Sequence, residues 1–100
     1  MALKTTLNYS PNFNSTKRRK KEIKFIIFHY TGMKKESSAI SRLINIQSEV
    51  SSHYLIKRSG EIITLVPDLY IAWHAGKSSW KKYKSLNKNS IGIEITNPGH

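Results

Sequence analysis

Two side chains in this sequence could together do hydrolytic chemistry, one as a metal ligand and the other as a proton acceptor. His29 ends the most apolar segment of the chain, and open α/β sheets gather ligands where their strands end. A neutral imidazole held there is a good zinc ligand; a core histidine bonded to a backbone carbonyl is the alternative. Glu94 follows Gly92 in a second apolar segment. An acid on a face of small residues favours a cleft and a general-base role, whereas a surface position or an ion pair with lysine is the alternative.

Other histidines are weaker candidates. Trp73 and His74 precede Ala75 and Gly76, and such small residues let a ligand approach the backbone. The alternative is a tryptophan that anchors the core beside a partly exposed histidine. We interpret His53 as structural. Histidines spaced four apart, a phosphate-binding glycine loop and a nucleophile elbow are all missing from the sequence. The residues alone therefore predict only a basic α/β domain with a His/Glu cleft.

The elements that must position these residues follow from hydrophobic periodicity. Residues 23–31 predict a strand, and Phe25–Phe28 is apolar on both faces, as in a strand covered from both sides. Residues 37–49 predict a helix capped by Ser37 or Ser38. Further strands are expected over residues 52–57, 61–66, 71–75 and 90–96, with a hairpin turn at 58–60 and a basic loop over 77–88 that contains Trp80 and Tyr83. The predicted class is α/β, a mixed central β-sheet with flanking helices, incomplete at the C-terminus.

Residues 1–21 form a predicted polar and basic N-terminal arm, and residues 22–100 the main body. Turn-forming residues without hydrophobic periodicity precede a block of basic residues, Lys17–Lys21. That block suits a nucleic acid or an acidic polymer, but a solvated surface segment is the favoured interpretation. A small nucleic-acid binder is the weakest of the functional hypotheses, and we expect no specific nucleic-acid partner.

Composition sets broad limits. The chain has 100 residues, a net charge of +11 and 38% hydrophobic residues, which suits one small domain with an affinity for polyanions. Without cysteine, a metal would have to be bound by His, Asp or Glu. No apolar run approaches the roughly 18 residues of a transmembrane segment, and the N-terminus does not read as a secretory signal. We therefore expect a cytoplasmic protein, with the periplasm or cell envelope as the alternative.

Five blocks of the sequence, in order, resemble the zinc-dependent N-acetylmuramoyl-L-alanine amidases. This family includes bacterial muropeptide amidases, phage lysozyme-type amidases and animal peptidoglycan recognition proteins. The matching blocks are residues 25–32 (FIIFHYTG), 50–56 (VSSHYLI), 60–67 (GEII with VP), 72–76 (AWHAG) and 89–95 (NSIGIEI). The resemblance spans about residues 23–100 and is closest to the bacterial muropeptide amidases at the end of the chain.

The resemblance implies a role for each matching residue. His29 corresponds to the first zinc ligand, and Glu94 to the acid that activates the metal-bound water. The phage branch uses a tyrosine at the position of Ser52 instead, so this chain follows the Glu type. Trp73 and His74 correspond to residues along the substrate groove, and Tyr30, next to His29, is added to the substrate-binding set. The implied reaction is zinc-assisted hydrolysis of the amide bond between N-acetylmuramic acid and L-alanine.

The sequence departs from the family pattern at the metal site. The family takes its second and third zinc ligands from positions further along the chain than His100, so this sequence supplies one ligand and a general base. We therefore expect the isolated chain to be inactive, with uncovered apolar sheet surface, poor solubility or oligomerisation. A non-catalytic peptidoglycan- or muropeptide-binding module is the alternative function. Intact wall and recycled muropeptide remain alternative substrates.

Overall fold

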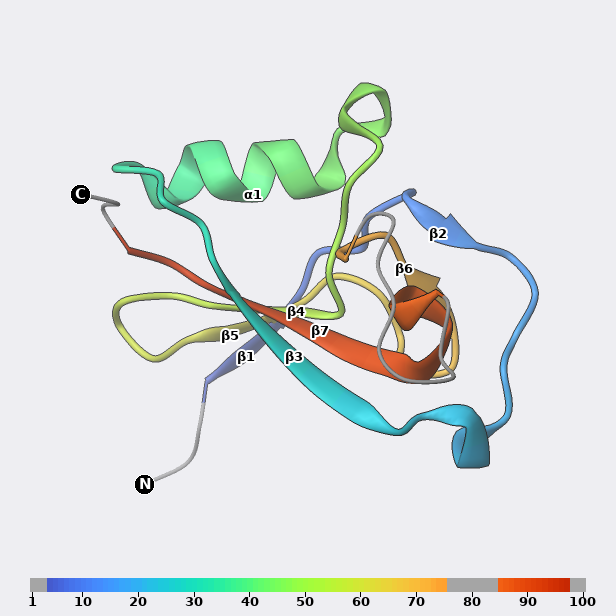
Figure 1. Ribbon diagram of the computed structural model, residues 1–100. Coiled ribbons are helices and arrows are strands. Elements are labelled where there is room, and N and C mark those ends of the chain that lie inside the picture. The colour runs from blue at the N-terminus through green and yellow to red at the C-terminus, as the bar shows by residue number, and fades with distance from the viewer. Residues whose placement is uncertain (1–3, 76–84, 98–100) are drawn as a thin grey trace.

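The computed structural model describes residues 4–75 and 85–97, which form a mixed α/β fold (Figure 1). Its α-helix is α1 (Glu36–Ile44), and three short 3-10 turns are η1 (Lys20–Glu22), η2 (Ile46–Ser48) and η3 (Leu86–Asn89). The strands are β1 (Thr5–Leu7), β2 (Phe13–Asn14), β3 (Phe25–Tyr30), β4 (Tyr54–Ile56), β5 (Ile62–Thr64), β6 (Ile71–Ala72) and β7 (Ser90–Ile95). Within these ranges no helix is long and apolar enough to cross a membrane. The predicted fold class is confirmed.

The central sheet has five strands in the order β1-β5-β4-β7-β3, and β2 and β6 form a separate antiparallel pair. β7 lies between β4 and β3 and is parallel to both, whereas β4 and β5 form the predicted antiparallel hairpin. Gly60 ends the hairpin turn with a φ of 92°, a backbone conformation that favours glycine. The sheet is therefore mixed, and its longest pairing joins the two strands that carry His29 and Glu94.

The core lies between α1 and one face of the sheet. Ala39 and Leu43 project from the helix at a spacing of four, so they share one face. They pack with apolar residues of β4, of β5 and the segment after it, and of β6, namely Leu55, Ile63, Leu65, Val66 and Ala72. This packing places α1 over the face of β7 that carries Glu94.

The predicted helix over 37–49 is shorter in the structure and begins elsewhere. Lys35 is the N-cap and makes no side-chain capping bond, so the predicted cap at Ser37 or Ser38 is wrong. The helix ends at Ile44 because Asn45 adopts an extended backbone, and its side-chain oxygen accepts a bond from Gln47 N at 2.9 Å. A local side-chain bond of this kind competes with helix continuation.

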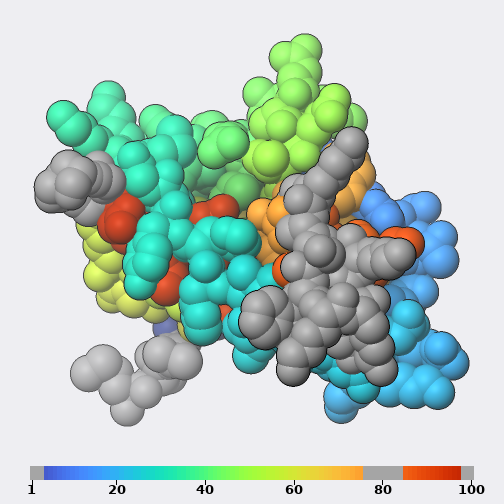
Figure 2. Space-filling view, viewed as in Figure 1, coloured from blue at the N-terminus to red at the C-terminus, as the bar shows by residue number. Residues whose placement is uncertain are grey.

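Within the described part of the chain, β3 is covered on one face only, which corrects the prediction of a strand covered from both sides. Its residues alternate between half-buried and exposed; Ile26, Phe28 and Tyr30 are 62%, 56% and 68% exposed. Figure 2 shows side chains of this segment (teal) at the front of the molecule, with no described segment in front of them. The described α-helix packs on the opposite face. The expected uncovered apolar sheet surface is thus present.

The N-terminal segment is integrated with the sheet. β1 pairs in parallel with β5, and β2 pairs with β6. The interpretation of the basic block as solvated is wrong for Arg18, which is 6% exposed. Its guanidinium donates to the backbone carbonyls of Asp68, Asn87 and Lys88 at 2.8–3.1 Å. Arg18 therefore connects the N-terminal segment to the turn that precedes β7, while the other residues of the block are exposed.

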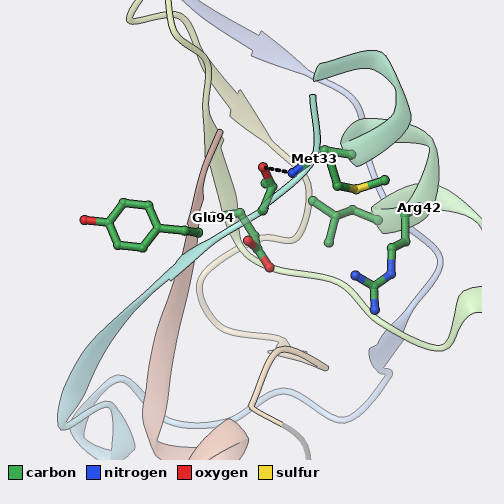
Figure 3. A pocket seen from close by; sticks show the side chains of 7 residues that line it. Met33, Arg42 and Glu94 are labelled. Atoms are coloured by element: carbon green, nitrogen blue, oxygen red, sulfur yellow. Dashed lines mark hydrogen bonds between the residues drawn. The ribbon is translucent and has the colours of Figure 1, made fainter. Parts of the chain in front are cut away.

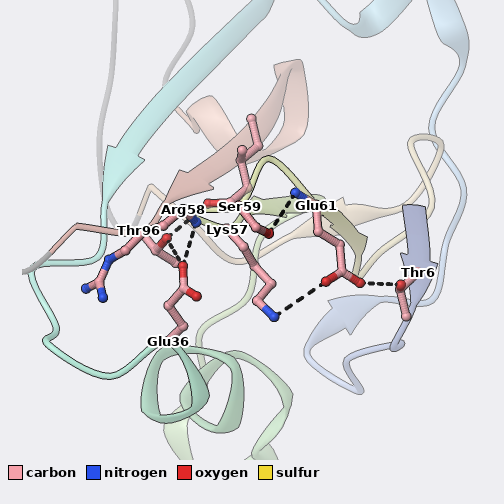
Figure 4. A network of polar contacts seen from close by, with 8 residues as sticks. Thr6, Glu36, Lys57, Arg58, Ser59, Glu61 and Thr96 are labelled. Carbon is pink, nitrogen blue, oxygen red and sulfur yellow. Dashed lines mark hydrogen bonds and ion pairs between the residues drawn. The ribbon is translucent and has the colours of Figure 1, made fainter. Parts of the chain in front are cut away.

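A polar network holds the β4–β5 hairpin against β1 and α1 (Figure 4). Glu61 accepts a hydrogen bond from Thr6 Oγ1 at 2.5 Å and forms an ion pair with Lys57 at 3.4 Å. On the other side of the turn, Glu36 accepts bonds from Arg58 N at 2.6 Å and Thr96 Oγ1 at 2.5 Å. These contacts join α1 to the end of β7 and so help to keep the helix over the Glu94 face.

Candidate active site

His29 and Glu94 are direct neighbours across two parallel strands. The register of β3 and β7 pairs His29 with Glu94, and paired residues of adjacent strands project to the same face of a sheet. On that face, Ser90, Gly92 and Glu94 follow one another along β7 with a period of two. The structure thus brings together the two residues that the sequence identified as candidate metal ligand and candidate base.

His74 joins this pair from a segment outside the central sheet. Its Nδ1 lies 3.1 Å from His29 Nε2, and the two rings meet edge to face with centroids 5.3 Å apart. Its Nε2 lies 2.9 Å from Ser90 Oγ. Burial, followed by the neighbouring His29, lowers the pKa of His74 to about 3, so the ring is neutral at ordinary pH.

The ring of His74 occupies space that any side chain at position 92 would fill. A Cβ added to Gly92 would lie 2.3 Å from His74 Cγ and 2.5 Å from Cδ2, well inside van der Waals contact. The backbone next to the ring is held by Asn87 Oδ1, which accepts from His74 N at 3.2 Å and Ala75 N at 2.8 Å. Gly92 is therefore the residue that admits His74 to the strand pair.

Glu94 points into a small pocket between the sheet and α1 (Figure 3). The pocket holds about 40 Å³ and is lined by residues of β3, β7, α1 and the loop before α1: Tyr30, Thr31, Met33, Ala39, Arg42, Leu43 and Glu94. Glu94 Oε2 is buried and has no hydrogen-bond partner among the described residues. Burial raises the pKa of Glu94, against the opposing effects of His29 and Arg42. A carboxylate in this state is a stronger base than an exposed one.

His53 has the structural role that the sequence interpretation gave it. It is fully buried, its Nδ1 accepts from Gly92 N at 3.0 Å, and its Nε2 donates to Tyr70 O at 2.8 Å. The guanidinium of Arg18 lies 3.2 Å from the same Nε2. Burial, and to a lesser extent Arg18, lowers the pKa of His53, which keeps the ring neutral. Both nitrogens are thus used to position β7 and the segment before β6.

The remaining predicted site residues lie around this centre. Trp73 directly precedes His74; its indole N–H donates to Asn14 Oδ1 at 2.7 Å, and its backbone exchanges bonds with Ser51. Tyr30 follows His29, is largely exposed and contributes to the rim of the Glu94 pocket. Their role in binding substrate stays a prediction. Of the basic loop expected over residues 77–88, residues 77–84, with Trp80 and Tyr83, lie outside the described residues.

The donor set of the described residues does not complete a zinc site. Catalytic zinc takes three protein ligands plus water. His29 keeps one ring nitrogen without a hydrogen bond among the described residues, which fits one ligand. However, residues 4–75 and 85–97 contain no group of three or more His, Cys, Asp or Glu side chains that could hold a metal. His29 therefore fits as one ligand of a metal, and the described part of the chain does not provide the rest.

Two residues of this centre, Ser90 and Gly92, were not identified as functional from the sequence. The signal was available, because the period of two along residues 90–96 places both on the face of Glu94. What the sequence could not indicate was the approach of His74 to that face, since positions 74 and 92 are 18 apart and the connecting segment has no regular pattern. The glycine is needed at this position because of a tertiary contact.

The chain is similar to N-acetylmuramoyl-L-alanine amidases. A family profile described by that name matches residues 19–100. The amidase AmiD of Escherichia coli (strain K12) is 40% identical over 84 residues, which cover 77% of this chain and 29% of AmiD. The 1,6-anhydro-N-acetylmuramyl-L-alanine amidase AmpD of Citrobacter freundii is 52% identical over 46 residues, which cover 46% of this chain and 25% of AmpD. The segments matched in sequence thus cover less than a third of the length of each of these relatives.

Solved structures agree with this similarity. AmiD of E. coli in complex with anhydro-N-acetylmuramic acid-L-Ala-D-gamma-Glu-L-Lys superimposes with a TM-score of 0.67, over 77% of this chain and 32% of that one. AmpDh3 of Pseudomonas aeruginosa, in complex with anhydromuramic pentapeptide, gives a TM-score of 0.70 at 32% identity, over 85% of this chain and 38% of that one.

Proposed function

Because this chain belongs to the N-acetylmuramoyl-L-alanine amidase family, we propose that it supplies part of a site that hydrolyses the amide bond between N-acetylmuramic acid and L-alanine in peptidoglycan. The observation that carries the proposal is the pairing of His29 with Glu94 across β3 and β7, with a buried carboxylate oxygen that has no hydrogen-bond partner among the described residues. A muropeptide is the favoured substrate class, since AmiD and AmpDh3 were solved with anhydromuramyl peptides.

Each residue has a distinct part in the proposed reaction. Glu94 accepts the proton of the attacking water and passes it to the departing amine of L-alanine. Its raised pKa, and an Oε2 that has no partner in residues 4–75 and 85–97, suit that exchange, because the carboxyl must take up a proton and then release it. His29 would offer one nitrogen to a zinc ion, which when bound would polarise the carbonyl and acidify water. Trp73, His74 and Tyr30 are proposed to contact the substrate.

Zinc catalysis requires ligands beyond those described here, so the isolated chain should not turn over substrate. The native protein isolated from its source cells is the proper test material, and its intact mass shows whether it extends beyond these residues. We expect release of the stem peptide from purified muropeptides, measured by mass spectrometry, to be lost with a chelator and restored by zinc. Release by the 100-residue chain alone would contradict the assignment of a single ligand.

Substitution of Glu94 tests the general base in that native protein. Glu94→Gln keeps the shape but removes the proton acceptor, and general-base catalysis contributes about 10²–10⁴-fold to such rates. The matched control is Glu49→Gln, since Glu49 is exposed and outside the site. Full activity of Glu94→Gln, or an equal loss in both variants, would contradict the role of Glu94.

A non-catalytic muropeptide-binding module is the second candidate function. The observation in its favour is the incomplete metal donor set of the described residues. Calorimetric titration of the 100-residue chain with a muropeptide distinguishes the two. Binding that survives a chelator, together with no release by the native protein, would favour the binding module.

A further inference from the structure

A chain of hydrogen bonds runs from a backbone carbonyl to His29. Ser90 Oγ lies 2.6 Å from Leu86 O, and a carbonyl oxygen can only accept, so the hydroxyl proton of Ser90 must point to Leu86. The hydroxyl then has only lone pairs left. Ser90 is fully buried at the start of β7, so no exposure to solvent offers its hydroxyl another arrangement.

The direction of that first bond decides the proton position on the next ring. His74 Nε2 lies 2.9 Å from Ser90 Oγ and must donate to it, because Ser90 has no proton left to give. A neutral imidazole carries one N–H, so His74 Nδ1 is an acceptor. His29 Nε2, 3.1 Å from that Nδ1, must in turn be the donor. Because a neutral imidazole carries only one N–H, His29 Nδ1 is then left without a proton.

We propose that Ser90 and His74 are positioning residues that hold His29 in its Nε2–H tautomer and so make Nδ1 its free nitrogen. Histidines that bind metals are commonly oriented in this way, by a partner that accepts the N–H of the other ring nitrogen. The order of the hydrogen bonds follows from the distances between Ser90, His74 and His29 alone. The use of Nδ1 as the metal-binding nitrogen, in contrast, rests on the proposed function.

Two further contacts show that this arrangement is built into the fold. The missing side chain of Gly92 provides the space for the His74 ring, and Asn87 holds the backbone of His74 and Ala75. No hydrogen bond to His29 Nδ1 is found within the described residues. Both ring nitrogens of His74 form hydrogen bonds, one with His29 and one with Ser90. His74 thus has a positioning role in addition to its proposed place along the substrate groove.

The tautomer of His29 can be measured without substrate and without metal. Long-range ¹H–¹⁵N spectra of the 100-residue chain distinguish protonated from unprotonated ring nitrogens, at about pH 8, where an ordinary imidazole is neutral. We expect His29 as the Nε2–H form. In Ser90→Ala the ratio of Nε2–H to Nδ1–H should fall about fivefold, the equivalent of one hydrogen bond of about 1 kcal/mol. An Nδ1–H form in the parent chain would overturn the proposal.

Ser52→Ala is the matched control. Ser52 is also fully buried and its hydroxyl also donates to a backbone carbonyl, that of Tyr54 at 3.0 Å, but it bonds no histidine side chain among the described residues. The two variants lose comparable hydrogen bonds, so only Ser90→Ala should change the His29 spectrum. An equal change in both, or no change in either, would overturn the role of Ser90.

A second pair of variants applies if Ser90→Ala does not fold. His74→Asn keeps an amide oxygen near the place of Nδ1, whereas His74→Leu has a similar size and no acceptor. The Asn variant should keep the Nε2–H form of His29, and the Leu variant should lose it. Identical His29 spectra for the two would overturn the proposal. Because no muropeptide is involved, this result is independent of whether the protein proves to be an amidase.

Discussion

Substitution of Gly92 by alanine tests the geometry of the site most directly. The added Cβ would lie 2.3–2.7 Å from three atoms of the His74 ring, so the ring has to move. Overpacking of this kind costs about 1–3 kcal/mol. Movement of the ring also weakens its bonds to His29 and Ser90, each worth about 1 kcal/mol. Alanine is otherwise preferred over glycine in a strand by about 0.5–1 kcal/mol. We therefore expect a net destabilisation of about 2–4 kcal/mol.

Urea unfolding of the 100-residue chain, followed by circular dichroism, measures this change. With a slope of about 1–3 kcal/mol per molar for a small protein, the midpoint should fall by about 1–2 M. The double variant Gly92→Ala, His74→Ala removes the clash, so the two substitutions should couple by at least about 1 kcal/mol. Unchanged or higher stability of Gly92→Ala would refute the placement of His74 over β7, and with it the derivation of the His29 tautomer.

Three further predictions concern stability, pH and association. Arg18→Gln should lower the free energy of unfolding by about 2–4 kcal/mol, because the backbone carbonyls that Arg18 bonds lose their donor. The control Lys21→Gln, at an exposed position, should change the free energy of unfolding by less than about 0.5 kcal/mol. Equal urea midpoints for the two variants would contradict this. Burial raises the folded-state pKa of Glu94, so the carboxyl favours folding below its ordinary pKa and this contribution is lost as the pH rises through the raised value. The free energy of unfolding of Glu94→Gln should accordingly increase relative to that of the parent as the pH rises. A difference in unfolding free energy between the two that stays constant from pH 4 to 8 would contradict this prediction. β3 is the edge strand of the sheet and exposes apolar side chains, so we expect the chain to associate as its concentration rises in gel filtration. The double variant Ile26→Lys, Phe28→Lys should reduce this association. A parent chain that is monodisperse at all concentrations would count against the prediction.

Local patterns in the sequence were enough for the main strands and for the hairpin, but they misplaced the ends of the helix and missed β1 and β2. The sequence placed Glu94 on a face of small residues with Gly92, and the structure confirms that these two residues share a face of β7. Gly60 and its neighbours predicted the hairpin because a tight turn needs a residue that tolerates positive φ. The resemblance to amidases pointed to His29 and Glu94, and the family profile confirms the resemblance. These features depend on residues close together in the chain.

The tertiary structure decided what depends on distant segments. Composition suggested a solvated basic block, but Arg18 is buried because the carbonyls of Asn87 and Lys88 lie beside it. Periodicity indicated a strand covered on both faces, although hydrophobicity alone cannot show whether anything packs against the second face. The contact of His74 with His29 joins residues 45 positions apart, and its proton order follows from a carbonyl at Leu86 that no pattern singles out. Sequence thus determined which groups are present and which face each occupies. The direction of every proton between them depends on distances that only the folded chain sets.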